Sequence, residues 1–339
     1  MSGGTETPIL EVDDLRVYFD TDDGVVKAVD GVSWSVAPGE TLAIVGESGS
    51  GKSVSALAVM GLLPMPPARY ESGRISYRGT DLLAADKKTM RDLRGNKIAM
   101  IFQDPLSALN PVYKVGHQIA EVLQVHTKMG RIPARRRAVD LLDEVGLSDP
   151  RRRAEEYPHQ FSGGMRQRVM IAMALALDPD ILIADEPTTA LDVTVQAQIM
   201  ELLMSLQEQH GTAIVLITHD LGLVAAHAKR VLVMYAGRAV EVGDTDTIFY
   251  GPRHGYTYGL LASLPHLERT RGVRLEPITG QPPSLIAVPR GCPFHPRCRF
   301  AVDECATVRP ELAAQLAADH LAACLRSDDV AAAPAPVGA

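Results

Sequence analysis

The octapeptide GESGSGKS, from Gly46 to Ser53, has the residue types and spacing of a loop that binds the phosphates of a nucleotide. Its glycines let the backbone curl so that successive N–H groups point at one anion. The ammonium group of Lys52 suits the β- and γ-phosphates, and the Ser53 hydroxyl suits Mg²⁺. A turn without a ligand is disfavoured, because a strand-like run precedes the loop and a helix-like run follows it. The predicted phosphate site consists of Gly46, Glu47, Ser48, Gly49, Ser50, Gly51, Lys52 and Ser53.

Two adjacent carboxylates form a second candidate site. Asp185 and Glu186 follow the apolar run 181–184, and Pro187 comes directly after them. Asp185 could hold Mg²⁺ through water, while Glu186 could orient or deprotonate a water that attacks the γ-phosphate. Acidic residues after a strand often only cap the next helix. Because a strand, two acids and a strand-ending proline occur here in order, we favour a role in hydrolysis.

A second glycine-rich turn, Ser162-Gly163-Gly164, precedes the helical run RQRVMIAMALAL. Bare N–H groups at the start of a helix again suit an anion. One chain therefore carries two turns that favour phosphate. Within one molecule they need not meet, but in a head-to-tail dimer the second turn can close over the γ-phosphate that the first turn of the other subunit binds.

Three nearly continuous apolar runs are expected to be the strands that carry these loops. They span 41–45, 181–184 and 213–218. Such runs fit strands that are covered on both faces, as in a parallel sheet. Between the last two, apolar residues repeat at helical spacing from Val195 to Leu206 and stop at Gly211, a natural helix end. The order strand, helix, strand predicts an α/β fold with a parallel sheet.

The remaining parts of the chain have other patterns. Helical patterns dominate residues 104–177, which predicts a helical insertion within a larger domain that spans residues 1–255. Prolines then interrupt every element, so we expect a small loop-rich C-terminal extension over residues 256–326. The final stretch, residues 327–339, has little to bury and is expected to be a disordered tail.

Composition and charge exclude several classes of function. The 339 residues are 46% hydrophobic, which is enough for a substantial core, and the net charge of −7 argues against a general nucleic-acid surface. The two arginine triplets, 135–137 and 151–153, are more typical of solvated faces, since no aromatic residues interleave with them. No apolar run reaches the roughly 18 residues of a membrane span, and the first residues do not resemble a signal peptide. We therefore expect a cytoplasmic chain without a nucleic-acid partner.

Six motifs in a fixed order resemble those of the nucleotide-binding subunits of ABC transporters, over about residues 10–251. They are GESGSGKS as the Walker A loop, Gln103 in IFQDP as the Q-loop, FSGGM at 161–165 as the signature, ILIADE as Walker B, Ala190-Leu191-Asp192 as the D-loop and His219 in ITHD as the switch histidine. This resemblance implies a P-loop NTPase (RecA-like) core, with ATP held between two such subunits. It also places Asp192 among the nucleotide-binding residues.

The resemblance further implies roles for single residues. Gln103 would sense Mg²⁺ or the γ-phosphate and report to the membrane partner, and His219 could donate a hydrogen bond to the transferring phosphoryl group. Phe19 would stack on adenine, with Tyr18 as the neighbouring candidate, although a core aromatic is nearly as good an interpretation of either. Because Glu186 and His219 are both present, we expect the site to hydrolyse ATP.

All four cysteines, Cys292, Cys298, Cys305 and Cys324, lie near the C-terminus. In a reducing compartment such a cluster suggests a metal site before it suggests disulfides. Tight CxxC pairs are missing, so zinc, an iron–sulfur cluster and unmetallated thiols all stay open. The segment resembles the C-terminal region of oligopeptide and dipeptide importer ATPases, and this resemblance implies a [4Fe-4S] cluster on the four cysteines. His295 could replace one ligand, and the cluster would hold the extension folded.

The resemblance implies an ATPase that energises the import of short peptides from the cytoplasmic face of the membrane. FSGGM, in place of the common LSGGQ, is usual in this branch. The implied partners are a second ABC ATPase subunit, favoured to be a related chain, two membrane permeases and, indirectly, an extracytoplasmic solute-binding protein. Nickel or another small solute is an alternative cargo. An ABC ATPase that acts in DNA repair or translation is disfavoured by the single cassette and the absence of sustained heptads.

Overall fold

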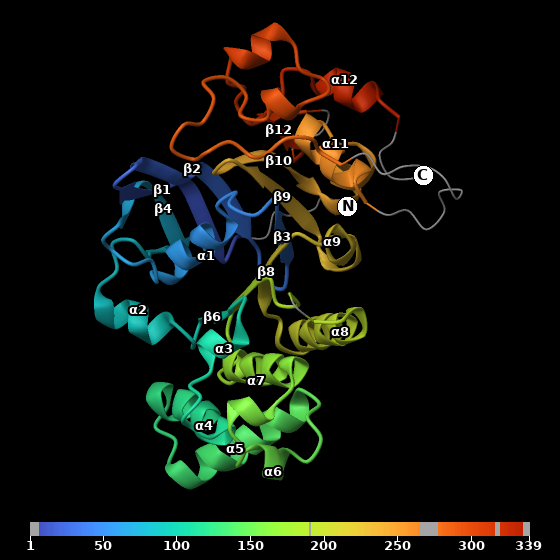
Figure 1. The fold of residues 1–339 in the computed structure, drawn as a ribbon. Helices are drawn as coiled ribbons and strands as arrows, with labels where there is room; N and C mark the ends of the chain where they lie inside the picture. The colour runs from blue at the N-terminus through green and yellow to red at the C-terminus, as the bar shows by residue number, and fades with distance from the viewer. Residues whose placement is uncertain (1–6, 190, 265–276, 316–318, 335–339) are drawn as a thin grey trace. The chain divides into compact units, whose positions relative to one another are not determined.

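The computed structural model describes residues 7–189, 191–264, 277–315 and 319–334, and its chain divides into two compact units (Figure 1). Among the described residues, the first unit comprises 7–8, 36–40 and 84–217. The second comprises 9–35, 41–83 and the described residues from 218 onward. These units cross the predicted boundaries at residues 255 and 326, so those boundaries stay predictions.

The first unit contains three parallel strands in the order β8, β7, β6. They are β6 (Ile98–Ile101), β7 (Ile181–Asp185) and β8 (Ala213–Thr218), and every residue of all three is buried. Helix α8 (Val193–His210) connects β7 to β8 and ends at Gly211, which has a left-handed backbone with φ of 68°. The predicted strand–helix–strand order and the parallel pairing are confirmed.

Helices make up most of the rest of the first unit. Between residues 104 and 177 the structure has helices and no strand, and the helices α4, α5 and α6 lie together there, green in Figure 1. Leu141 and Leu142 of α5 are buried, as is Leu123 of α4, and the two helices pack on each other. The helices of this unit are α2 (Lys87–Leu93), α3 (Pro105–Ala108), α4 (Val115–His126), α5 (Arg131–Glu144), α6 (Pro150–Arg153), the 3₁₀ helix η1 (Pro158–Gln160), α7 (Gly163–Leu175) and α8.

The second unit contains an antiparallel sheet that the sequence analysis did not predict. Its strands are β1 (Leu10–Thr21), β2 (Gly24–Val36), β4 (Ala68–Tyr77) and β5 (Thr80–Asp81), in the order β2-β1-β4-β5. Strands β1 and β4 pair from Leu10 opposite Tyr77 to Phe19 opposite Ala68. This sheet therefore fixes the strand on which the two candidate adenine-binding aromatics lie.

A second set of strands in this unit follows the order β11-β12-β10-β9-β3. Strand β3 (Thr41–Val45) is parallel to β9 (Arg230–Tyr235), and β10 (Arg238–Asp244) is antiparallel to β9. The two-residue strands β12 (Leu321–Ala322) and β11 (Ala313–Ala314) extend this set from the C-terminal region.

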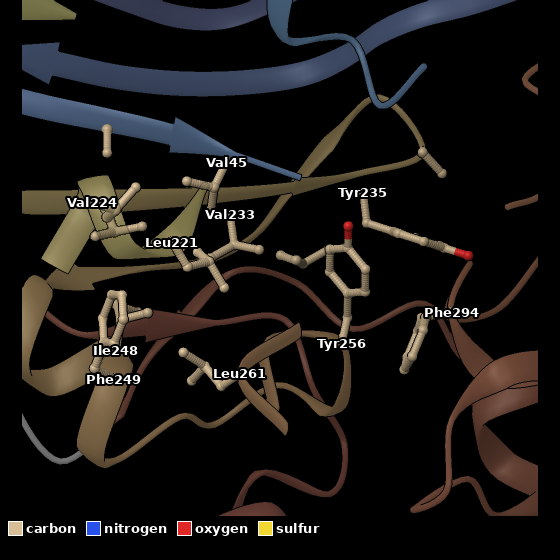
Figure 2. Packing of buried hydrophobic residues seen from close by; sticks show 14 residues of the cluster. Val45, Leu221, Val224, Val233, Tyr235, Ile248, Phe249, Tyr256, Leu261 and Phe294 are labelled. Carbon is tan, nitrogen blue, oxygen red and sulfur yellow. The ribbon is translucent and has the colours of Figure 1, made fainter. Parts of the chain in front are cut away.

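Helices α9, α10 and α11 of the second unit pack into one apolar core, to which the C-terminal region contributes (Figure 2). Val45 and Val233 come from β3 and β9, Leu261 from α11, and Phe294 from the segment before the 3₁₀ helix η2. The core therefore joins the strand before the phosphate loop to the C-terminal region. The helices are α1 (Lys52–Met60), α9 (Leu221–His227), α10 (Thr245–Tyr250), α11 (Gly255–Ala262), η2 (His295–Arg297), η3 (Asp303–Ala306) and α12 (Ser327–Ala332).

The predicted disordered tail is wrong for its first residues. Ser327–Ala332 form α12, and Val330 is only 1% exposed where it packs against Tyr258 of α11. The Tyr258 hydroxyl donates a hydrogen bond to the carbonyl of Pro334 at 3.1 Å. Tertiary contacts therefore order a segment whose own composition favours disorder. Residues 335–339 of the predicted tail lie outside the described residues.

Among the described residues, no helix combines the length and the apolar character that a membrane crossing requires.

Candidate nucleotide-binding site

The loop between β3 and α1 has a backbone that only glycine accommodates at two positions. Gly46 has φ of +153°, and a Cβ added there would lie 2.2 Å from the carbonyl oxygen of Met234. Gly51 has φ of +102°, and its added Cβ would lie 2.2 Å from the carbonyl oxygen of Ala28. Any side chain at either position would have to displace main chain. The loop path is therefore fixed by its close approach to neighbouring strands.

Lys52, the first residue of α1, supplies positive charge to this loop. Its side chain is buried, and Nζ donates hydrogen bonds to the carbonyls of Gly46 at 2.8 Å and Glu47 at 2.9 Å. Ser53 follows it in the first turn of the helix and is half-buried. An ammonium group and the N-terminus of a nine-residue helix together favour an anion at this position.

The structure separates the two aromatic candidates for adenine stacking. Tyr18 is 8% exposed, and its hydroxyl donates to Asp30 Oδ1 at 2.8 Å. Burial, together with this carboxylate, raises the pKa of Tyr18. Tyr18 is therefore a core residue. Phe19, the next residue of β1, points to the opposite face and is half-buried, so it stays the predicted adenine contact.

Glu186 and Gln103 are brought together in the first unit. Gln103 Nε2 donates to Glu186 Oε2 at 3.0 Å, and the Thr189 hydroxyl donates to the same oxygen at 2.8 Å. Glu186 has a left-handed backbone with φ of 47°, held by a hydrogen bond from its N–H to the Ile217 carbonyl at 2.8 Å. Such conformations cost about 1–3 kcal/mol and cluster at functional sites. Its neighbour Asp185 ends β7 and is buried.

The turn Ser162-Gly163-Gly164 opens α7 and packs closely against α8. The Ser162 hydroxyl caps α7 by accepting a hydrogen bond from the Met165 N–H at 3.3 Å. A Cβ added at Gly164 would lie 2.7 Å from Val195 Cγ1. Gly164 is therefore needed for the approach of two helices as well as for its bare N–H.

The D-loop lies against the same turn. Leu191 Cδ2 would lie 3.5 Å from a Cβ added at Gly163, and Asp192 Oδ1 caps α8 by accepting from the Val195 N–H at 2.9 Å. Leu191 and Asp192 are thus fixed by the contact between α7 and α8. Ala190, the first D-loop residue, lies outside the described residues.

His219 follows β8 directly and is exposed. Asp220, the next residue, caps α9 by accepting hydrogen bonds from the N–H groups of Gly222 at 2.8 Å and Leu223 at 3.3 Å. The imidazole is therefore held between the end of a strand and a capped helix start. His219, Lys52 and Phe19 belong to the second unit, while Gln103 and Glu186 belong to the first.

The four cysteines are free thiols that gather in the C-terminal region. The Cys292 N–H donates to the Cys305 carbonyl at 2.9 Å, and His295 Nδ1 lies 2.9 Å from the Cys292 carbonyl. Burial raises the pKa of Cys292 and of Cys298 to about 11, and it also raises the pKa of Cys324. The charges of neighbouring thiolates add to the increase in the pKa of each of these three cysteines.

No three His, Cys, Asp or Glu side chains among the described residues, which include all four cysteines, are grouped so that they could hold one metal ion. The geometry therefore does not support the ligand set expected for a [4Fe-4S] cluster or for zinc.

Comparison with known proteins places the chain in a family. A family model described as "ABC transporter" matches residues 29–189, and one described as "Oligopeptide/dipeptide transporter, C-terminal region" matches residues 240–305. The oligopeptide transport ATP-binding protein OppD of Bacillus subtilis is 55% identical over 296 residues, which are 87% of this chain and 83% of that protein. The chain belongs to the oligopeptide/dipeptide transport ATP-binding proteins of the ABC transporter family. The family resemblance seen in the sequence is confirmed.

Other similarities agree with membership of this ABC ATP-binding family. OppD of Mycobacterium bovis is 54% identical over 323 residues, 95% of this chain and 52% of the mycobacterial protein, so this chain spans about half the length of that relative. The dimeric ATP-binding cassette MJ0796, solved with ADP and Pi, is 28% identical with a TM-score of 0.63, covering 70% of this chain and 98% of that one. The predicted P-loop ATPase fold is thereby confirmed.

Sequence reasoning missed several residues that contact the motifs of this ABC family member. Thr189 follows Glu186 by three residues, a spacing that could have suggested its hydrogen bond. Tyr256 and Arg297 contact the phosphate loop from the C-terminal region, and no local pattern indicates that role.

Proposed function

We propose that this chain is the ATP-hydrolysing subunit that energises the import of short peptides through a membrane ABC transporter. One observation carries the proposal: a single chain combines a complete phosphate loop and a held catalytic carboxylate with a C-terminal region of the oligopeptide/dipeptide type. Import of nickel or another small solute is the competing candidate, because the ATPase site itself does not contact the cargo in this scheme.

Each residue of the site has a separate role in the proposed hydrolysis of ATP. The loop N–H groups and Lys52 bind the phosphates, and Glu186 orients or deprotonates the attacking water. Gln103 and Thr189 fix the direction of the Glu186 carboxylate through their hydrogen bonds. His219 donates a hydrogen bond to the transferring group and stabilises its developing charge.

The oxygen donors at these motifs suit Mg²⁺, which prefers hydroxyl, carboxylate and water ligands. Ser53 would bind the ion directly, while Asp185 and Gln103 would contribute through water or the side-chain oxygen. When bound, the ion neutralises charge on the β- and γ-phosphates.

Two subunits are needed to complete one site in this proposal. The turn Ser162-Gly163-Gly164 and Asp192 of one subunit would close over ATP on the phosphate loop of the other. We propose a related ATPase chain as the partner, two membrane permeases on the cytoplasmic face of the membrane, and an extracytoplasmic solute-binding protein that acts through the permeases.

A separate proposal concerns metal binding by the four cysteines. We propose the [4Fe-4S] cluster that the family resemblance implies on the match to the C-terminal family model alone, because the described side chains are not grouped to hold a metal. Because the thiols are not grouped for a metal, no step of ATP hydrolysis is derived from it. Measuring iron, sulfide and zinc in the purified full chain tests the cluster proposal. Zinc without iron, or neither metal, would contradict the proposal.

The decisive experiment uses the assembled complex in vesicles. Wild type should hydrolyse ATP faster when short peptides are supplied, whereas Glu186→Gln should bind ATP, stay in the closed dimer and lose at least about 100-fold in turnover, the usual scale for a lost catalytic base. Unchanged turnover of E186Q would exclude the assigned base. Stimulation by nickel and not by peptides would overturn the choice of cargo.

A further inference from the structure

The carboxylate of Glu47, the second residue of the phosphate loop, is held by an arginine of the C-terminal region. Arg297 Nη1 donates to Glu47 Oε2 at 2.7 Å, and Nη2 donates to Oε1 at 2.9 Å. Arg297 Nη1 also donates to the Tyr235 hydroxyl at 3.2 Å, and Nε donates to the Thr279 carbonyl at 3.0 Å. This bidentate pairing fixes both the charge and the direction of the carboxylate.

The main chain of Glu47 is held from the same region. Its N–H donates to the hydroxyl of Tyr256, a fully buried residue of α11, at 2.7 Å. Figure 2 shows Tyr256 beside Tyr235 and Phe294. The ring centroids of the two tyrosines lie 4.6 Å apart. The Glu47 carbonyl in turn accepts a hydrogen bond from Lys52 Nζ. Glu47 therefore joins the C-terminal region to the lysine that binds phosphate.

Electrostatics give this contact a consequence for nucleotide binding. The side chains of Arg297 and Glu47 are only 6% and 26% exposed, so water screens their charges weakly. A triphosphate bound on the loop is a polyanion, and an unpaired carboxylate on the same loop would repel it. Arg297 cancels that charge and draws the carboxylate toward the C-terminal region.

We propose that Arg297 is a positioning residue for the nucleotide site: it neutralises Glu47 and thereby lets the phosphate loop bind ATP tightly. The affinity of the phosphate loop for ATP then depends on a contact that the C-terminal region provides. This inference rests on the proposed function, since it requires that the loop binds ATP.

The test measures MgATP binding to the full chain by calorimetry. Arg297→Ala leaves Glu47 unpaired, and we expect affinity to fall about tenfold, the effect of one weakly screened like charge near a polyanion. The double variant R297A/E47Q removes the repelling charge as well, so affinity should recover to within about threefold of wild type. A merely structural role of Arg297 would not be rescued in this way, because the double variant also lacks the bidentate pair.

A matched control removes another arginine–carboxylate pair of the second unit. Asp328 forms an ion pair with Arg253 at 3.1 Å, and its side chain is 98% exposed. No contact between Asp328 and the phosphate loop is found among the described residues. The variant Asp328→Ala should therefore bind MgATP as wild type does. Thermal unfolding of R297A shows whether it is folded, and Arg297→Lys, which keeps the charge, should lose less affinity. Equal affinities of wild type and R297A, or no recovery in R297A/E47Q, would overturn the inference alone. Failure of wild type to bind MgATP would instead overturn the proposed function.

Discussion

Single residues fix the direction of the Glu186 carboxylate, the proposed catalytic base, and Thr189 provides the clearest test. Its hydroxyl donates to Glu186 Oε2 at 2.8 Å. Thr189→Val keeps the shape and removes the donor, and an accessible hydrogen bond to a charged group contributes about 1 kcal/mol. We therefore expect kcat of the assembled complex to fall about fivefold, with KM for ATP little changed. Thr189→Ser keeps the hydroxyl and serves as the control. Equal kcat values for T189V and wild type would contradict this role.

The sequence was enough to identify most of the candidate site residues, but not several of the contacts that they make. Lys52, Asp185 and Glu186 stand out because a short motif specifies them next to recognisable strands. The hydrogen bond between Gln103 and Glu186 joins residues 83 positions apart, and nothing local indicates it. Burial identifies Tyr18, the neighbouring candidate, as a core residue, so Phe19 stays the predicted adenine contact.

At the scale of elements, the approach of α7 to α8 depends on a single missing side chain. A Cβ at Gly164 would lie 2.7 Å from Val195 Cγ1, which is too close for both to stay in place. Gly164→Ala is expected to lower the free energy of unfolding by about 1–3 kcal/mol, as overpacking does. Adding Val195→Ala makes room, so the double variant G164A/V195A should unfold at a higher urea concentration than G164A. An equal or lower midpoint in the double variant would refute this account of the contact.

Strands that are buried at every residue could be predicted, because they appear in the sequence as continuous apolar runs. Thr41–Val45 and Ala213–Thr218 are buried on every residue, so their apolar runs match the observed strands β3 and β8. Strands β1 and β4 are partly exposed and pair residues 49 to 67 positions apart, so neither a continuous run nor their pairing was evident. Helix α12 was missed because one buried side chain, Val330, orders it through contact with another segment.

For the whole molecule, the C-terminal region and the phosphate loop share one compact unit, and the strand before the loop, β3, shares one apolar core with that region. Arg297 and Glu47 are 250 positions apart in the chain, so their ion pair exists only because this core brings β9, α11 and the segment before η2 together. No local pattern in the C-terminal extension indicates this contact, since motifs reveal a site but not the distant contacts that support it. Stability of this core should therefore affect the nucleotide site as a whole.

The buried histidine of this core makes a prediction about how the stability of the protein depends on pH. His254 is 1% exposed, and Nδ1 caps α11 by accepting a hydrogen bond from the Tyr256 N–H at 3.1 Å, which requires a neutral ring. Burial lowers the pKa of His254 to about 4, from an ordinary value near 6.5. Below pH 6.5 the unfolded chain binds a proton that the folded chain does not bind until about pH 4, so stability is lost as pH falls through this window.

The size of that loss can be isolated with one variant. A shift from 6.5 to about 4 corresponds to a loss on the order of 3 kcal/mol across the window. Asparagine is a good helix cap that does not titrate, so His254→Asn should keep α11 and remove this part of the pH dependence. Urea unfolding of both proteins between pH 4.5 and 7.5 measures the difference, and other titrating groups, including the His320–Glu241 pair, cancel because both proteins contain them. Parallel stability curves would show that His254 has the same pKa in the folded and the unfolded chain, which would contradict the lowered pKa of the buried ring.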